Sequence, residues 1–273
     1  MSGPANSTTD RWGNRTYTWN GEEFQSVTTI LKGIPKEALI GWAANVTADA
    51  AIEAAKTGAL EKLIEQDEAG ARKFLTQARF TKRDDAADAG SLIHRAIEAH
   101  ILGAEAPVVP ITLRASMDTF HQFEAEYQPV WEASEATVYN RTDGWAGTLD
   151  AICVIGGRRI ILDVKSGKNA YPEHAVQLNA YARGEFIGLP DGTEHPMPEL
   201  DGAAVLHLRP RGFKLIDIPL DDRVYGVLRT AADMREWLRV TSKTALGVEI
   251  PADGRRLADH GIERFGDTKG EVA

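Results

Sequence analysis

Short apolar runs alternate with turn residues in the middle of the chain. Residues 136–140, 146–155 and 158–165 are rich in β-branched and other apolar side chains, which predicts three strands. The second and third runs flank Gly156-Gly157, a dipeptide that suits a two-residue hairpin turn because glycine adopts positive φ without strain. The pattern therefore predicts an antiparallel hairpin in which Ile155 pairs with Arg158.

Helical periodicity precedes and follows these strands. Alternation around Asn20-Gly21 predicts an N-terminal hairpin, and Ser26 suits the N-cap of a short helix after it. Residues 36–79 are Ala-rich and helical in pattern, with breaks expected at Gly58 and Gly70. Further helices are predicted at 82–102, 113–131, 172–187 and 221–245, and two more strands at 203–208 and 213–218.

The order of these elements indicates the fold class. A helix, three strands, a helix and a further strand are typical of an α/β fold. The strands are apolar on both faces, so we expect a mixed central sheet flanked by helices. The chain divides into an N-terminal hairpin and helical elaboration (1–81), a core (82–245) and a polar tail that we expect to be flexible (246–273).

Composition narrows the classes of function. The chain has 273 residues, of which 43% are hydrophobic, and a formal net charge of −9. This acidic balance argues against non-specific coating of nucleic acid, which needs Lys and Arg for phosphates, but it allows an enzyme with a basic cleft. The single cysteine, Cys153, excludes an internal disulfide and any four-cysteine zinc or iron–sulfur site.

The sequence carries no sign of export or membrane insertion. No apolar run approaches the length of about 18 residues that a membrane-spanning helix needs. The first residues also lack the apolar segment of a secretory signal. We therefore expect a cytoplasmic protein.

The predicted hairpin brings charged side chains together. In its register Asp150 lies opposite Asp163, with Cβ atoms about 4.5–5.5 Å apart, and like charges at that separation are destabilising. Lys165 follows on the same face as Asp163. A divalent cation with Lys165 at its edge would supply the missing positive charge. The alternatives are a solvated sheet edge or a bulge that breaks the register.

Carboxylates in this arrangement suit a particular chemistry. Hard oxygen ligands favour Mg²⁺, and Mn²⁺ is a common substitute. A cation and a lysine ammonium stabilise charge that builds up on a phosphate during hydrolysis. Asp150, Asp163 and Lys165 are therefore candidate residues for holding a cation and acting on a phosphate.

His94 is a candidate ligand on a helix. It lies at the border of an apolar stripe formed by Ile93, Ile97 and Ile101, one turn after Gly90. Gly90 costs about 1 kcal/mol of helix propensity relative to Ala, which is tolerable where another group must approach closely. A lone helical histidine is nevertheless more often packed or solvated than a ligand.

Other polar helix residues have similarly open interpretations. His100, His121 and His174 are interpreted as packed or solvated side chains for the same reason. Gln177 and Tyr181 are four residues apart and share a helix face, where an amide and a phenol can hold a phosphate, a base edge or a catalytic lysine. The alternative for this pair is an ordinary polar helix face.

Taken together, these residues match an ordered set of motifs. The set resembles the RecB-like branch of the PD-(D/E)XK nuclease superfamily, and especially phage exonucleases related to the CRISPR-associated RecB-like nucleases. It spans residues 90–181 and is more specific than any one of its members. The motifs are Gly90-x-x-x-His94, Gly147-x-x-Asp150, Asp163-x-Lys165 and Gln177-x-x-x-Tyr181.

The resemblance implies a restriction-endonuclease-like core and specific roles for individual residues. The implied metal ligands are His94, Asp150, Asp163 and the main-chain carbonyl of Val164. Lys165 takes the catalytic role, Glu135 is a further acidic participant, and Gln177 and Tyr181 organise the site or contact DNA. Several RecB-like relatives carry a four-cysteine iron–sulfur cluster, which this chain cannot hold.

We therefore expect a Mg²⁺-dependent deoxyribonuclease, most simply an exonuclease of phage DNA recombination, repair or replication. One alternative is a structure-specific or site-specific endonuclease with the same fold. Another is a catalytically silent nucleic-acid-binding subunit, although such a module has no need of opposed carboxylates. The sequence leaves cleavage polarity, strand preference and oligomeric state open.

DNA and a protein partner are the expected interaction partners. The chain has no phosphate-binding loop of an ATP motor, so unwinding would require a partner helicase, and a single-strand annealing protein is the other expected partner. Trp145 is expected to pack beneath the site rather than stack on a base. Basic residues near the core could grip phosphates or be solvated surface charges: Lys82, Arg83, Arg158, Arg159, Lys168, Arg183, Arg209 and Arg211.

Overall fold

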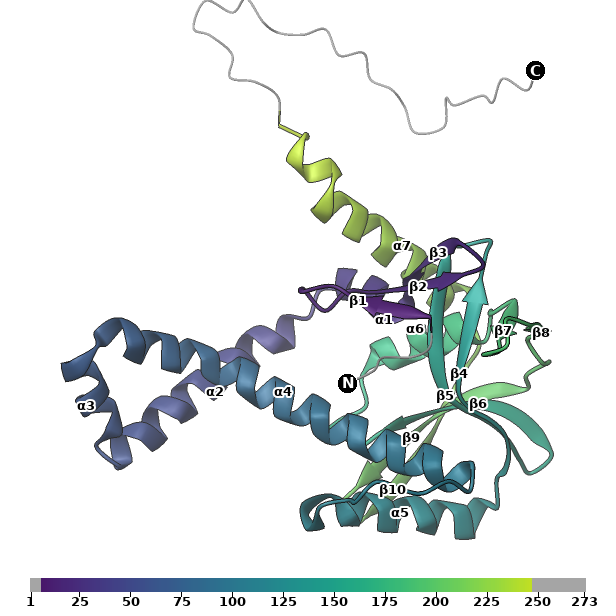
Figure 1. The fold of residues 1–273 in the computed structure, drawn as a ribbon, viewed down its shortest axis with the longest axis horizontal. Helices are drawn as coiled ribbons and strands as arrows, with labels where there is room; N and C mark the ends of the chain where they lie inside the picture. Colours follow the sequence, from purple (N-terminus) through teal and green to yellow (C-terminus); the bar gives the residue numbers. More distant parts are fainter. Residues whose placement is uncertain (1–5, 247–273) are drawn as a thin grey trace, which may run out of the picture. The chain divides into compact units, whose positions relative to one another are not determined.

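The computed structural model describes residues 6–246 of the chain (Figure 1). Residues up to Arg235 form one compact unit, and Glu236 begins a second. The helices are α1 (Val27–Ile30), α2 (Glu37–Lys56), α3 (Ala59–Gln66), α4 (Glu68–Ile101), α5 (Ile111–Tyr127), α6 (Pro172–Tyr181) and α7 (Asp222–Arg239), with 3-10 turns η1 (Leu31–Gly33) and η2 (Thr241–Lys243). The strands are β1 (Ser7–Thr9), β2 (Arg15–Trp19), β3 (Glu22–Ser26), β4 (Val130–Asn140), β5 (Trp145–Ile155), β6 (Arg158–Lys165), β7 (Phe186–Gly188), β8 (Glu194–Pro196), β9 (Gly202–Arg209) and β10 (Gly212–Ile218).

The protein is a mixed α/β structure in which all ten strands join one sheet. Its centre runs β4, β5, β6, β9 and β10, with antiparallel neighbours except for the parallel pair β6 and β9. The hairpin register predicted from the sequence is confirmed, since Ile155 pairs with Arg158 and the pairing continues to Ala151 and Leu162. The mixed sheet flanked by helices is thus confirmed as the general architecture.

One edge of β5 is shared by two different strands. β4 pairs along almost the whole of the other edge. On the shared edge, β3 runs parallel to Trp145 and Ala146, and β6 pairs with β5 from Ala151 onward. Pairing on this edge therefore stops at Ala146 and resumes at Ala151. The interval contains the Gly147-x-x-Asp150 motif, so the sheet opens where the candidate chemistry lies.

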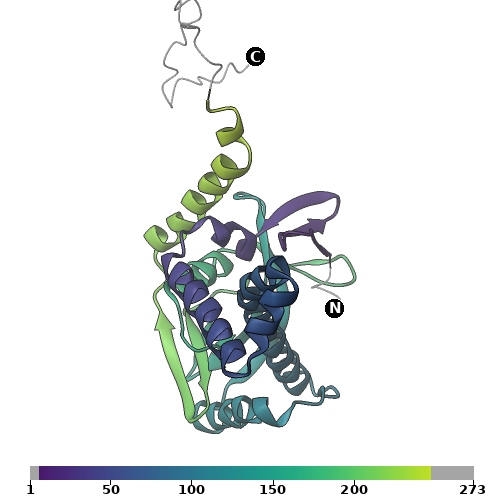
Figure 2. The same cartoon turned by 90° about the vertical axis from the view of Figure 1, so that its left-hand side faces the viewer.

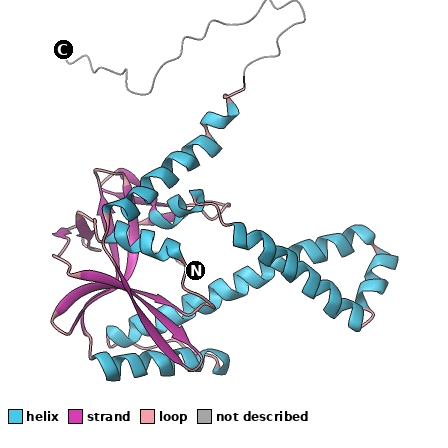
Figure 3. Cartoon of the chain, turned by 180° about the vertical axis from the view of Figure 1, so that it is seen from behind, coloured by secondary structure: helices cyan, strands magenta, loops and turns pink. Residues whose placement is uncertain are grey.

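Apolar side chains cover both faces of the sheet, and helices lie on either side of it (Figure 3). One core includes Val27 of α1, Leu178 of α6 and Leu228 of α7, packed with strand residues such as Ile161 and Val205. The other core joins α4 and α5 to alternate positions of the same strands, such as Leu162, Val164 and Leu206. Burial on both faces explains why the strands are continuously apolar in sequence.

The long helix α4 links a helical arm to the sheet (Figures 1 and 2). It has 34 residues, which corresponds to a length of about 51 Å. Its first half packs with α2 and α3, and α2 has no fully buried residue. Its last three turns bury Ile93 and Ile97 in the core beside α5. The helix therefore carries His94 from the arm onto the sheet.

Several predicted boundaries are wrong. The break expected at Gly70 occurs at Asp67 instead, and Gly70 leaves room for the carboxylate of Asp67, since a Cβ there would meet Oδ2 at 2.3 Å. The helix predicted to run to residue 131 ends at Tyr127, because Gln128 adopts a left-handed conformation and starts the turn into β4. β4 is consequently six residues longer than predicted, since its first half is not continuously apolar.

Other corrections concern segments that are too short to leave a periodic signal. The helix predicted for 172–187 ends at Tyr181, and β7 follows it. Two short strands were not predicted: β8, which precedes β9, and β1, which precedes the N-terminal hairpin. The boundary predicted between residues 81 and 82 lies inside α4.

Apart from Leu246, the predicted tail lies outside the described residues. No helix within 6–246 combines the length and apolarity that a membrane span requires.

The difference in burial between two tryptophans predicts a large difference in how much their substitution destabilises the protein. Trp145 is 1% exposed and its Nε1 donates a hydrogen bond to Tyr225 Oη at 2.9 Å, whereas Trp12 is 71% exposed. We expect Trp145→Ala to lower the free energy of unfolding by about 3–5 kcal/mol, and the control Trp12→Ala to change it by about 0.5 kcal/mol or less. Urea unfolding followed by circular dichroism measures both. Equal losses would contradict the assigned core.

Candidate metal centre and active site

Asp150 occupies the opening between β5 and β6. Its Oδ2 accepts a hydrogen bond from the main-chain N–H of Val164 at 2.7 Å. This N–H lies just beyond the last recorded pair of the hairpin, Ala151 with Leu162, so a side-chain carboxylate takes the place of a ladder acceptor. The predicted register thus reaches the residues next to Asp150 and Asp163, but the pairing ends at Ala151 and Leu162, and the Asp150 carboxylate is directed at the backbone of β6.

Three donor groups from three elements converge at this point. His94 Nδ1, on α4, lies 3.4 Å from Asp150 Oδ1 on β5 and 3.7 Å from Glu135 Oε1 on β4. One ligand atom from each residue lies within 4.8 Å of the other two. The predicted ligands His94 and Asp150 are thus brought together, and Glu135 completes the group with them.

Glu135 has an unusual backbone. Its φ is +48°, in the left-handed region that non-glycine residues seldom adopt. Its neighbours Ser134 and Ala136 pair with Ala151 and Leu149, so Glu135 lies level with Asp150, and the β4–β5 register has shifted just before it. Such a conformation costs on the order of 1–3 kcal/mol and persists only where the surrounding structure imposes it. With this backbone conformation, Glu135 Oε1 lies 3.7 Å from His94 Nδ1.

Asp163 and Lys165 form a buried ion pair beside this group. Lys165 Nζ donates a hydrogen bond to Asp163 Oδ1 at 2.6 Å, and Asp163 is 2% exposed. The other oxygen, Asp163 Oδ2, is buried without a hydrogen-bond partner. A buried carboxylate oxygen left in this state is costly unless another positive group completes it. Asp163 is not among the three converging ligands, so the predicted set is only partly assembled.

The charges of the site shift its pKa values in opposite directions. Burial raises the pKa of Asp163, and Lys165 counters this only in part. Burial also acts to raise the pKa of Asp150, but the charges of His94 and Lys165 outweigh it and hold that pKa below its usual range. Burial would lower the pKa of His94, yet Asp150 and Glu135 raise it to about 10. The two aspartates are therefore electrostatically distinct.

A small cavity lies among the converging ligands. Its volume is about 10 Å³, near the lower end of the roughly 10–15 Å³ that a single ordered water needs. The residues that line it include His94, Glu98, Glu135, Asp150 and Val164. Space for one small particle between two carboxylates and an imidazole fits a divalent cation.

Glu98 was missed by the sequence interpretation. It lies one turn after His94 on α4 and lines the same cavity, and burial followed by the charge of Glu135 raises its pKa. The spacing His94-x-x-x-Glu98 was the available signal, because residues four apart share a helix face. The main-chain carbonyl of Val164 was predicted as the fourth ligand. Val164 lines the cavity, and its N–H donates a hydrogen bond to Asp150 Oδ2.

Gln177 and Tyr181 lie against the opening in the sheet. Gln177 Nε2 donates a hydrogen bond to Tyr181 Oη at 3.1 Å, and Tyr181 is 2% exposed. A Cβ at Gly147 would lie 2.4 Å from Tyr181 Cε1, so only glycine fits beneath this ring. Gly90 differs, because a Cβ there would meet nothing within 4 Å among the described residues.

Some residues considered for DNA contact are buried or bound to other protein groups. Trp145 is buried and packs as expected. Three arginines are held by protein groups: Arg158 by Asp201, Arg159 by Glu132 and Arg183 by Asp222 and Asn179. His174 is packed at the start of α6, where its Nδ1 accepts the N–H of Tyr171 at 3.3 Å. Lys168, Arg209 and Arg211 are exposed and remain candidates for phosphate contact.

Comparisons with known proteins do not assign the chain to a family. No protein-family model matches the sequence, and no curated protein matches it. Among solved structures, one described as "Crystal structure of SSO0001" is 14% identical, with a TM-score of 0.27 over 45% of this chain and 55% of that one. The matched part spans about half of that chain, and a similarity this low carries no argument about fold or function.

Substitution by alanine should change the free energy of unfolding in opposite directions at Gly147 and Gly90. Gly147→Ala places a Cβ inside the Tyr181 ring contact, so we expect it to lower the free energy of unfolding by about 1–3 kcal/mol. Gly90→Ala meets open space within α4, so we expect it to raise that free energy by about 0.5–1 kcal/mol. Denaturant unfolding of both variants measures the difference. A Gly147→Ala protein as stable as the wild type would contradict the Tyr181 packing.

Proposed function

We propose that this protein is a metal-dependent deoxyribonuclease with a PD-(D/E)XK core. The observation that carries the proposal is the convergence of His94, Glu135 and Asp150 around a cavity of about 10 Å³, beside the buried pair of Lys165 and Asp163. An imidazole, several carboxylates and a lysine are the groups that metal-assisted phosphodiester hydrolysis uses. The motif order in the sequence supports the same assignment.

The proposed core consists of the elements that carry these groups. α4 supplies His94, β4 supplies Glu135, β5 supplies Asp150, and β6 supplies Asp163 and Lys165. α5 lies between α4 and β4, and α6, β7, β8 and β9 follow β6, an order that is compatible with the proposed core. Sites built on strands and helices hold their side chains more rigidly than sites on loops, which favours catalysis.

His94, Glu135 and Asp150 would hold the cation, with Asp163 and the carbonyl of Val164 as further oxygen groups. When bound, Mg²⁺ or Mn²⁺ supplies stabilisation of the negative charge that develops on the phosphodiester. The hydrogen bond from Val164 N–H fixes Asp150 Oδ2, so Oδ1 remains directed toward His94 and the cavity.

Lys165 would act on the substrate. Its side chain is 23% exposed, its Nζ lies 2.6 Å from Asp163 Oδ1, and the negative charges of Asp163 and Asp150 keep its pKa above the usual range. The side chain is therefore a fixed positive charge at the edge of the ligand group. It would orient the attacking water and stabilise the phosphate as charge accumulates.

The exonuclease mode and the phage context rest on the resemblance of the motifs. DNA is the proposed substrate, and the exposed Lys168, Arg209 and Arg211 are its proposed phosphate contacts. A single-strand annealing protein or a helicase remains the proposed partner. The acidic net charge of −9 restricts DNA contact to a local surface rather than the whole molecule.

Cleavage of end-labelled linear DNA tests this function. We expect the purified protein to degrade the linear DNA with Mg²⁺ or Mn²⁺, to lose this activity in EDTA, and to spare a covalently closed circle. The circle is the control for mode, because an exonuclease requires an end. Cutting of the circle would replace the exonuclease by an endonuclease. Tight DNA binding without any metal-dependent cleavage would contradict a nuclease.

A double substitution tests the buried ion pair without leaving an uncompensated charge. Removing Lys165 alone leaves Asp163 buried and unpaired, which destabilises a protein by about 3–5 kcal/mol. Asp163→Asn with Lys165→Gln removes both charges and keeps the volume. We expect this variant to lose at least about 100-fold in cleavage rate while retaining its fold, as judged by circular dichroism.

The matched control is Lys214→Gln, on the exposed face of β10. We expect it to cleave at the wild-type rate. Wild-type turnover by the folded Asp163→Asn, Lys165→Gln protein would overturn the catalytic assignment.

A further inference from the structure

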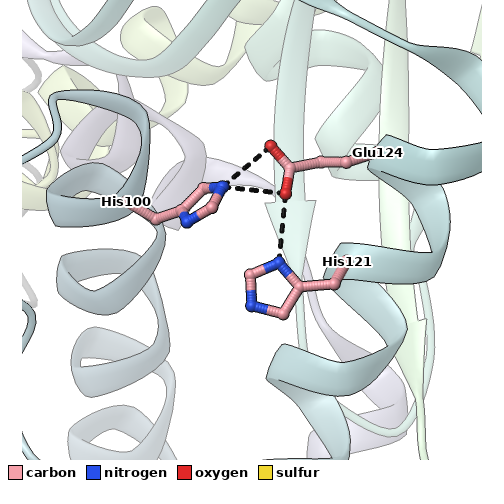
Figure 4. A group of neighbouring side chains, drawn as sticks. All are labelled: His100, His121 and Glu124. Atoms are coloured by element: carbon pink, nitrogen blue, oxygen red, sulfur yellow. Dashed lines mark hydrogen bonds and ion pairs between the residues drawn. The ribbon is translucent and has the colours of Figure 1, made fainter.

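A second group of metal-ligating side chains lies outside the proposed nuclease site. His100 is in the last turn of α4, and His121 and Glu124 lie three residues apart on α5. His100 Nε2 lies 3.1 Å from Glu124 Oε1 and 2.9 Å from Oε2, and His121 Nδ1 lies 3.1 Å from the same Oε2 (Figure 4). Both imidazoles thus face one carboxylate.

The carboxylate at the centre of this cluster is fixed by a further contact. Trp131 Nε1, on β4, donates a hydrogen bond to Glu124 Oε1 at 3.2 Å. Glu124 is largely buried, with a side-chain exposure of 20%, whereas His100 and His121 are 42% and 49% exposed. A donated hydrogen bond of this kind is what commonly orients a carboxylate that ligates a metal.

The spacing of the three groups is near that of a tetrahedral site. Zinc–nitrogen and zinc–oxygen bonds of about 2.0–2.2 Å separate neighbouring tetrahedral ligands by about 3.4 Å. The observed separations from Glu124 Oε2 are 2.9 Å to His100 Nε2 and 3.1 Å to His121 Nδ1. An outward movement of a few tenths of an ångström by two half-exposed rings would suffice.

We propose that His100, His121 and Glu124 bind a divalent transition-metal ion, with Zn²⁺ as the best fit. Two imidazoles and one carboxylate form a ligand set that suits zinc and leaves a fourth position for water. An open pocket adjoins the two histidines, lined also by Met117 and Asp118, so solvent reaches that position. Mg²⁺ prefers oxygen ligands and is a poor match for this set.

The ion would connect two helices across a connector without secondary structure. Residues 102–110 join α4 to α5, and the cluster ties the end of α4 to the middle of α5. This centre is separate from the nuclease site, because His94 lies six residues earlier on α4, about 9 Å along the helix axis. The proposed role is to stabilise the packing of α4 against α5.

A metal titration of the full chain tests this site. Zn²⁺ is added in the presence of millimolar Mg²⁺ and a competing chromophoric chelator, and thermal unfolding is followed in parallel. We expect a Zn²⁺ ion whose binding weakens at least about 10-fold in His100→Gln with His121→Gln, together with loss of the Zn²⁺-induced rise in Tm. Both rings are half-exposed, so the variant should fold, and circular dichroism checks this.

Two further variants locate the ion. His195→Gln, an exposed histidine on β8, is the matched control and should bind Zn²⁺ as the wild type does. His94→Gln should also retain this binding, because it alters only the nuclease site. Unchanged Zn²⁺ affinity in the double variant would overturn the proposal, as would loss of the tight ion in His94→Gln alone. Neither result depends on nuclease activity.

Discussion

The hydrogen bond from Val164 N–H to Asp150 Oδ2 is the interaction on which the candidate active site depends. β5 pairs with β3 at its start and with β6 further on, so the sheet opens between Ala146 and Ala151. A buried N–H at such an opening must find an acceptor, because an unpaired one costs about as much as a lost hydrogen bond. The Asp150 carboxylate is that acceptor. The same side chain thereby completes the backbone hydrogen bonding of β6 and contributes to the candidate metal site.

Two other features of the site are energetically unfavourable, and the surrounding fold has to offset their cost. Glu135 adopts a left-handed backbone within a strand, and Asp163 is buried with one oxygen unsatisfied. Neither feature stabilises the fold, and removing Lys165 alone would leave a buried charge uncompensated. These groups are held in place by the apolar cores on both faces of the sheet. Cation binding would relieve the local excess of negative charge, which is a physical reason to associate this strain with function.

Local sequence rules predicted the parts of this site that depend on one hairpin. Gly156-Gly157 and the short apolar runs beside it were sufficient for the register of the hairpin from Ile155 and Arg158 to Ala151 and Leu162. His94 came only from the resemblance, because no local pattern states where a helix crosses a sheet. The left-handed φ of Glu135 and the splitting of the β5 edge arise from tertiary pairing, so neither was predictable. The cluster of His100, His121 and Glu124 was missed for the same reason, since it joins two helices through a connector of nine residues.

The two ligand groups differ in chemistry although one helix contributes to both. His94 meets two carboxylates near a third, so oxygen donors dominate there, whereas His100 joins a second imidazole and a single carboxylate. A hard cation such as Mg²⁺ would therefore favour the His94 group, and a borderline cation such as Zn²⁺ would favour the His100 group. Because both histidines are on α4, an ion that fixes the end of this helix against α5 would also fix the rotation of the turn that carries His94. The second centre would in this way restrain the geometry of the first without contacting any substrate.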